Sequence, residues 1–220
     1  MARRILLIGG TGLVGSLFAE RLRVEGDFEL DLLLRRPSGR AASGGQEHVA
    51  PSTEWPEIAG RLGGEVAVSA LGTTIRAAGS QPAFRAVDFD LVVDFARAAR
   101  AGGARQMIVV SSVGADAGSR TFYLRTKGEM ERALEALDFE RLDIVRPGLL
   151  RGERVGERRQ GERLGIIISP LLNLVLRGRL DRFAAIEADV VAAAIAKLAR
   201  RDAQGTFIHH NRDLHQLARG

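Results

Sequence analysis

A short apolar run that ends in closely spaced glycines constrains this chain most. The run at residues 3–8 is followed at once by GGTGLVG (9–15) and then by apolar residues at helical spacing. This order predicts a strand, a tight turn and a helix. Gly9 would permit the turn, Gly12 would let a diphosphate approach the backbone, and Gly15 would let helix and strand pack closely. Because N–H groups at a helix start bind phosphates, the turn predicts a dinucleotide site.

Apolar strands and amphipathic helices alternate along most of the chain. Strands that are apolar throughout are typical of a parallel sheet that helices cover on both faces. The 220 residues contain no evident repeat or linker, so we expect a single α/β domain over 1–220, a Rossmann-type doubly wound parallel sheet. The expected strands are 3–8, 28–34, 66–71, 106–111, 142–145 and 206–209. The expected helices are 13–24, 55–62, 87–100 (apolar at Val87, Leu91, Phe95 and Ala98), 122–137, 187–201 and a short one from Asp213.

The pattern changes after Leu149. A charged stretch runs to Arg163, and an apolar segment follows at 164–176, interrupted by Pro170. About 13 residues are too few to cross a bilayer, which needs about 20. We therefore expect no membrane span and interpret 151–185 as a lid or a segment on the substrate side.

The composition limits the chemistry that the chain can perform. Cysteine is absent, which excludes disulfides, thiolate metal sites and a cysteine nucleophile. The first apolar run breaks into glycines and does not resemble a signal peptide, so we expect a cytoplasmic protein. No metal is expected, because a metal-ligand pattern is absent around the four histidines, His48, His209, His210 and His215.

The charge of the chain is positive but is not arranged for nucleic acid. The formal net charge is +5, and acids alternate with arginines between Glu153 and Arg163 instead of leaving one basic block. Nucleic-acid binding requires a cationic face, which this pattern does not indicate. We expect no nucleic-acid partner.

The end of the second expected strand indicates which dinucleotide would bind. NAD-selective sites place an aspartate or glutamate there for the ribose hydroxyls. This chain has Arg35 and Arg36 instead. Guanidinium groups bind phosphate through paired hydrogen bonds and stack on adenine. The pair favours NADP(H) over NAD(H), and the alternative is a solvated pair at the start of a loop.

Ser112, Tyr123 and Lys127 form a candidate catalytic set. Tyr123 and Lys127 are four residues apart, so one face of a helix would present the phenol and the ammonium together. Only Lys127 and Lys197 are lysines among 32 basic residues, which makes a surface role of the YxxxK pattern the weaker alternative. Tyr123 would exchange a proton with a carbonyl or alcohol, Ser112 would bond the same oxygen, and Lys127 would hold the nicotinamide ribose.

The serine of this set has an alternative. Ser111 and Ser112 together close the central strand, at the edge where doubly wound sheets bind ligands. Adjacent strand residues face opposite ways, so the loop decides which of the two hydroxyls enters the site.

These motifs together resemble the atypical short-chain dehydrogenases, specifically the Tat-interacting, oxidoreductase-like group with its bacterial relatives. The resemblance spans most of the chain and implies a Rossmann fold. The segments that carry it are GGTGLVG (9–15), RR (35–36), ALGTT (70–74), ARAGGARQMIVVSSVGAD (99–116), YLRTKGEME (123–131), RPGLL (146–150) and DLHQLA (213–218).

The resemblance also implies a cofactor, NADPH, and the residues that bind it. Members of this group act as regulators through protein partners as well, so a protein partner or a homo-oligomer is a further expectation. The implied binding residues are Gly9, Thr11, Gly12, Leu13, Val14, Gly15, Arg35, Arg36, Leu71, Gly72, Tyr123, Lys127 and Leu150, with Arg158 a looser match.

The expected function is that of an NADPH-dependent oxidoreductase with a small-molecule carbonyl or alcohol substrate. Two alternatives remain at this stage. One is a non-catalytic NADPH-binding protein that senses redox state or presents a surface to a partner. The other is an epimerase or dehydratase, which uses the same three side chains.

Overall fold

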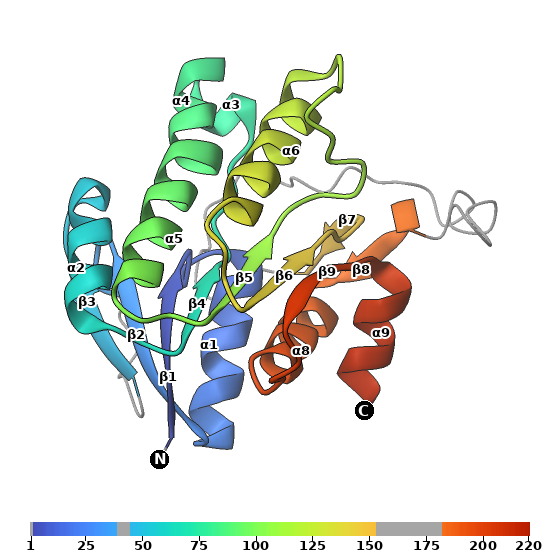
Figure 1. Ribbon diagram of the computed structural model, residues 1–220. Coiled ribbons are helices and arrows are strands. Elements are labelled where there is room, and N and C mark those ends of the chain that lie inside the picture. The colour runs from blue at the N-terminus through green and yellow to red at the C-terminus, as the bar shows by residue number, and fades with distance from the viewer. Residues whose placement is uncertain (1, 39–44, 153–181) are drawn as a thin grey trace.

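Seven parallel strands form the central sheet of the computed structural model, which describes residues 2–38, 45–152 and 182–220 (Figure 1). Ile5 of the first strand lies opposite Leu30 of the second strand and Val66 of the fourth. Across the sheet the order is β3-β2-β1-β4-β5-β6-β9. The strands are β1 Arg3–Ile8, β2 Phe28–Leu34, β3 Gly45–Val49, β4 Val66–Ser69, β5 Gln106–Val110, β6 Arg141–Val145 and β9 Gly205–His209.

The order in which strands are added to the sheet changes direction between β1 and β4. From β1 it builds outward through β2 and β3, and it then returns to place β4 on the other side of β1. The loops that leave β1 and β4 meet at the carboxyl edge of the sheet, at the switch point where doubly wound sheets bind ligands. These two loops hold the glycine turn (9–15) and ALGTT (70–74).

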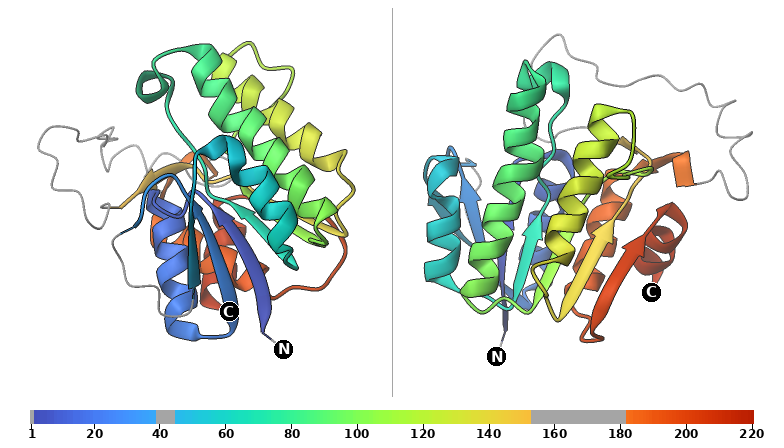
Figure 2. Two further views of the ribbon diagram at one scale, coloured as in Figure 1. Left: turned by 90° about the vertical axis from the view of Figure 1, so that its left-hand side faces the viewer. Right: turned by 45° about the horizontal axis from the view of Figure 1, so that its top comes forward.

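Helices cover both faces of the sheet (Figure 2). α1, α8 and α9 lie on one face, and α2, α5 and α6 on the other. Short helices α3 and α4 precede α5, and a π-helical turn at Ala86–Asp90 joins α4 to α5. The helices are α1 Leu13–Glu25, α2 Trp55–Leu62, α3 Ile75–Ala78, α4 Gln81–Arg85, α5 Leu91–Ala101, α6 Phe122–Glu135, α8 Ala188–Leu198 and α9 Asn211–Arg219, with a 3-10 turn at Ser52–Glu54.

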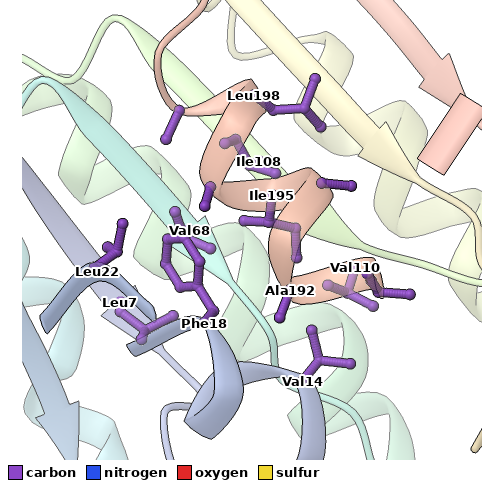
Figure 3. Close-up of a cluster of buried hydrophobic side chains, with 14 of the residues drawn as sticks. Leu7, Val14, Phe18, Leu22, Val68, Ile108, Val110, Ala192, Ile195 and Leu198 are labelled. Carbon is purple, nitrogen blue, oxygen red and sulfur yellow. The ribbon is translucent and has the colours of Figure 1, made fainter. Parts of the chain in front are cut away.

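Each face of the sheet has its own apolar core. Phe18 of α1 and Ile195 of α8 pack against Val68 of β4 on one face (Figure 3). Phe95 of α5 and Met130 of α6 belong to the core of the other face. Because both faces are buried, the strands are apolar at successive positions instead of alternating.

The predicted fold class is confirmed, and three strands go beyond the prediction. β3 is a polar strand at the edge of the described sheet, where it pairs with β2. A separate pair, β7 Leu149–Arg151 and β8 Ala185–Glu187, runs in parallel beside the main sheet.

The face predicted for the helix at 87–100 is correct at Phe95, which is fully buried, and wrong at its start. Val87 and Leu91 are only partly buried, whereas Asp88 and Val92 are buried. The buried face instead contains Asp88 together with Val92 and Phe95, which follow it by four and seven residues. The structure therefore turns a charged residue inward at this point.

The predicted lid or substrate-side segment at 151–185 lies mostly outside the described residues. Its apolar part (164–176) and Arg158 are outside them as well. The chain on either side of the gap forms β7 and β8, with Leu149 opposite Ala185. Within the described residues, no helix has the length and apolar character that a membrane crossing requires.

Candidate active site

The glycine turn after β1 leaves the start of α1 open. Gly9 has a φ of +83°, and a Cβ on Gly15 would lie 2.2 Å from the carbonyl oxygen of Gly9, so both positions require glycine. Gly12 donates its N–H to the same oxygen at 2.9 Å. In the described chain no side chain caps α1, and its first turn has no acidic residue. The helix start can therefore offer N–H groups and partial positive charge to a diphosphate.

The remaining residues of the turn differ in what they can offer a ligand. Thr11 is exposed, so its hydroxyl is accessible. Val14 is buried in the core, and Leu13 packs partly against it, so their side chains face away from a polar ligand. Leu150 of β7 packs against the same core, and a Cβ on Gly152 would lie 3.3 Å from Leu13 Cδ1. β7 is therefore close to the start of α1.

Arg35 and Arg36 are exposed at the end of β2. Within the described residues, neither guanidinium has a hydrogen bond or an ion pair. The turn that follows is fixed from β3, because Glu47 accepts hydrogen bonds from the N–H and the hydroxyl of Ser38. Asp31, within β2, is buried and paired with a histidine. The exposed end of β2 thus presents two cations.

Tyr123 and Lys127 lie one turn apart on α6. The ring of Tyr123 is 5.5 Å from the ring of Phe84, between centroids. The side chain of Lys127 is 3% exposed, and its Nζ lies 2.7 Å from Oδ1 of Asp88. Nζ also donates to the carbonyl of Val110, the last residue of β5, at 3.5 Å. An ammonium has three N–H groups, so at least one remains for a ligand at this edge of the sheet.

The two serines after β5 have different surroundings. Ser111 is buried and donates its hydroxyl hydrogen to Glu131 of α6, which also accepts a hydrogen bond from Arg146 at 3.0 Å. Ser112 is only partly buried, and its hydroxyl makes one long contact in the described structure, at 3.4 Å with the carbonyl of Val113. Ser111 is occupied by its partner, and Ser112 has the hydroxyl that a ligand could bind.

The loop after β4 is tied to the same carboxylate as the lysine. Thr73 donates its backbone N–H to Oδ2 of Asp88 at 3.0 Å. In the same loop Leu71 is partly buried and Gly72 is exposed, with nothing within 4 Å of a Cβ built on it. Of the residues expected near the cofactor, Leu71, Gly72 and Lys127 are therefore brought to one end of the sheet.

Sequence reasoning missed the charged residues that surround the expected set. Asp88 is fully buried beside Lys127, and Glu131 links Ser111 to Arg146. His210 follows β9 at the same edge of the sheet. Burial lowers the pKa of His210, and the positive charge of Arg146 lowers it further.

Two of the histidines pair with buried carboxylates. Nε2 of His48 lies 2.7 Å from Asp31, and Nε2 of His209 lies 2.8 Å from Asp143. In the parts of the chain that the structure describes, no group of three or more His, Asp or Glu residues could hold a metal ion.

The sequence and the fold match known proteins. The HIM1 family model matches residues 49–167, more than half of the chain. The mitochondrial protein fmp52 of Emericella nidulans is 35% identical over 198 residues, which are 86% of this chain and 84% of the relative. The mitochondrial protein fmp52 of Aspergillus niger is 31% identical and covers 98% of both chains.

Two of the solved structures that resemble this fold name NAD in their descriptions. One is described as an NAD-dependent epimerase/dehydratase from Bacillus halodurans, with a TM-score of 0.69, 21% identity and 99% of both chains covered. Another is the Bordetella bronchiseptica enzyme WbmG in complex with NAD, with a TM-score of 0.68 and 16% identity over 96% of this chain and 73% of that one. At these identities the likeness establishes the Rossmann-type fold.

The comparisons correct one expectation and leave another as a prediction. The expected cytoplasmic location is contradicted, because the relatives at 31–36% identity are named mitochondrial proteins. The narrower resemblance to the Tat-interacting, oxidoreductase-like group stays a prediction.

Proposed function

The chain belongs to the HIM1 family, and we propose that it acts as an NADPH-dependent oxidoreductase of the atypical short-chain dehydrogenase type. It would reduce a small-molecule carbonyl or oxidise the corresponding alcohol. The narrower kinship with the Tat-interacting, oxidoreductase-like group is part of the same proposal. The observation that carries it is the buried Lys127, which holds an ammonium at the sheet edge one helical turn after Tyr123.

The residues at the sheet edge fit a phosphorylated dinucleotide. The uncapped start of α1 can bind the diphosphate, and Gly9 and Gly15 leave the backbone room to be approached. Arg35 and Arg36 are exposed and without partners in the described chain, as a site for the 2′-phosphate requires. The NAD complex of WbmG, which shares this fold, supports a nicotinamide dinucleotide here.

The remaining N–H of Lys127 is suited to a ribose hydroxyl. Asp88 and Val110 both contact the ammonium, so the side chain is already oriented before a ligand arrives.

Tyr123 would transfer the proton, and Ser112 would donate a hydrogen bond. NADPH, when bound, supplies the hydride that reduces the carbonyl carbon. The carbonyl oxygen then gains negative charge, and Tyr123 donates its phenolic proton to it. Ser112 donates a hydrogen bond to the same oxygen, since its hydroxyl has only a long contact within the described residues.

The test compares wild type with Tyr123→Phe. NADPH oxidation is followed with a panel of aldehydes and ketones, and NADPH affinity is measured separately by fluorescence. We expect the variant to lose turnover by about 10²–10⁴-fold, because it lacks the acid, and to keep its affinity for NADPH. A variant that turns over as fast as wild type would refute the role of Tyr123.

A second candidate is an epimerase or dehydratase. The fold neighbours described as epimerases or dehydratases favour it, because they match 94–99% of this chain. Such an enzyme keeps its dinucleotide through the cycle, so purified protein would retain the dinucleotide and consume no NADPH. A non-catalytic binder would bind NADPH and turn over nothing. The set of Ser112, Tyr123 and Lys127 favours an enzyme over a binder, because binding alone requires only the lysine.

A further inference from the structure

A buried carboxylate outside the expected set holds the lysine of the proposed site. We propose that Asp88 is a positioning residue, which fixes the ammonium of Lys127 and couples it to the loop after β4. The inference rests on the proposed function and adds to it a residue that touches neither substrate nor cofactor.

The contacts of Asp88 use both oxygens of its carboxylate. Oδ1 lies 2.7 Å from Nζ of Lys127, and Oδ2 accepts the backbone N–H of Thr73 at 3.0 Å. Asp88 lies in the π-helical turn between α4 and α5, and its side chain is fully buried. Such turns occur often at functional sites. One carboxylate thus joins α6 to the loop that follows β4.

The burial of the pair makes each of the two charges costly without the other. An ammonium that is 3% exposed loses most of its hydration, and a buried charge is costly unless it is paired. Within the described residues, Asp88 is the carboxylate that forms an ion pair with Lys127. Glu131, one turn further along α6, is committed to Arg146.

The hydrogen bond from Thr73 to Asp88 connects the lysine to the loop after β4. Thr73 directly follows Leu71 and Gly72, which we expect to line the dinucleotide site. Any shift of this loop would move the carboxylate, and with it the ammonium. Asp88 therefore joins the lysine to the loop that we expect to line the dinucleotide site.

The experiment replaces the charge and keeps the shape, as Asp88→Asn. The matched control is Asp143→Asn, which removes another fully buried carboxylate. Asp143 lies 2.6 Å from Arg141 and is not part of the proposed set of Ser112, Tyr123 and Lys127. Both variants lose a buried ion pair, so their melting temperatures report the structural cost. We expect Asp88→Asn to lower kcat at least about tenfold and to weaken NADPH binding, with the KM for the carbonyl unchanged. Asp143→Asn should keep kcat per folded molecule.

A double-mutant cycle with Lys127→Met covers the case in which Asp88→Asn folds poorly. Removing both charges leaves no uncompensated ion, so the double variant should regain stability over Asp88→Asn. If Asp88 acts through the lysine, Asp88→Asn should cause no further loss of NADPH affinity once Lys127 is Met.

The outcomes separate this inference from the proposed function. A wild-type protein that neither binds NADPH nor reduces carbonyls would refute the proposed function. A wild-type protein that does both, with Asp88→Asn no different from Asp143→Asn in kcat and NADPH affinity, would refute the role of Asp88. Additive losses of affinity in the cycle would refute it as well.

Discussion

Gly15 faces the carbonyl oxygen of Gly9 so closely that a Cβ on Gly15 would lie 2.2 Å from that oxygen. The same oxygen accepts the N–H of Gly12. This contact keeps the start of α1 against the end of β1, where the proposed diphosphate site lies. The carbonyl oxygen of Gly9 and the Cα of Gly15 both belong to the backbone. Neither can therefore rotate away to make room for a side chain on Gly15.

Gly15→Ala should therefore disturb both the turn and the ligand site. We expect the free energy of unfolding to fall by about 1–3 kcal/mol, which is typical of overpacking, and NADPH affinity to fall with it. Urea unfolding and fluorescence titration measure the two effects. The matched control is Gly60→Ala in α2, where a Cβ would lie 3.5 Å from its nearest neighbour, an ordinary contact. An alanine at position 15 without effect on either measurement would contradict the tight turn.

Removing the two exposed guanidinium groups after β2 should change the choice of cofactor. In the double variant Arg35→Ala with Arg36→Ala, we expect NADPH affinity to fall about tenfold or more, because each charge-assisted bond contributes about 1.5–3 kcal/mol. Affinity for NADH should stay the same. Arg201→Ala, at another exposed arginine, is the control. Equal affinity of the wild-type protein for NADPH and NADH would remove the role given to the pair.

The two serines should respond differently to alanine. Ser112→Ala should lower turnover with little effect on stability, since its hydroxyl makes only a long contact in the described structure. Ser111→Ala should lower the free energy of unfolding by about 1–3 kcal/mol, because Glu131 loses a buried donor. Thermal unfolding and NADPH oxidation on both variants separate the effects. The assignment of Ser112 fails if Ser111→Ala loses turnover and Ser112→Ala does not.

The stability of the protein should depend on Asp143 in acid. Burial alone would raise the pKa of the Asp143 carboxyl, but hydrogen bonds from His209, Arg141 and Gln106 outweigh burial and hold the pKa below its usual 3.8. A lowered pKa contributes stability that is present above the unfolded value and is lost as the pH falls through the folded one. We therefore expect this contribution to persist down to about pH 4 and to disappear below it.

Urea unfolding between pH 6 and pH 3 checks this expectation on wild type and Asp143→Asn. The variant should be less stable by about 3–5 kcal/mol at pH 6, because Arg141 loses its buried partner. The difference between the two proteins should shrink below pH 4. A difference that stays constant across the whole range would show that Asp143 does not titrate as proposed.

Much of the fold follows from the spacing of apolar residues. Strands buried on both faces, such as β1 and β5, are apolar at successive positions, and this pattern predicts a parallel sheet directly. β3 was not predicted, because its sequence, GQEHV, is mostly polar. Such a sequence suits the edge of the described sheet, where β3 has a neighbour on one side. β7 and β8 have three residues each, too few for a periodic signal.

Candidate site residues could be predicted from the sequence where their residue type is rare in this chain. They could not be predicted where the residue type is common. Tyr123 is the only tyrosine and Lys127 is one of two lysines, so their spacing was visible in the sequence. Asp88 was not, because the buried face of that helix was predicted wrongly at its start. Its distances of four and seven residues to Val92 and Phe95 were the available signal, since that spacing puts a carboxylate on the buried face. The partner of a buried charge, by contrast, comes from a distant element and depends on the fold.

A crystal structure of the protein with NADP⁺ would locate the cofactor relative to the proposed site residues. We expect the diphosphate against the first N–H groups of α1, the 2′-phosphate beside Arg35 and Arg36, and the nicotinamide ring next to Tyr123 and Lys127. A dinucleotide bound at any other part of the molecule, or a phenol of Tyr123 turned away from the nicotinamide, would contradict the proposed site.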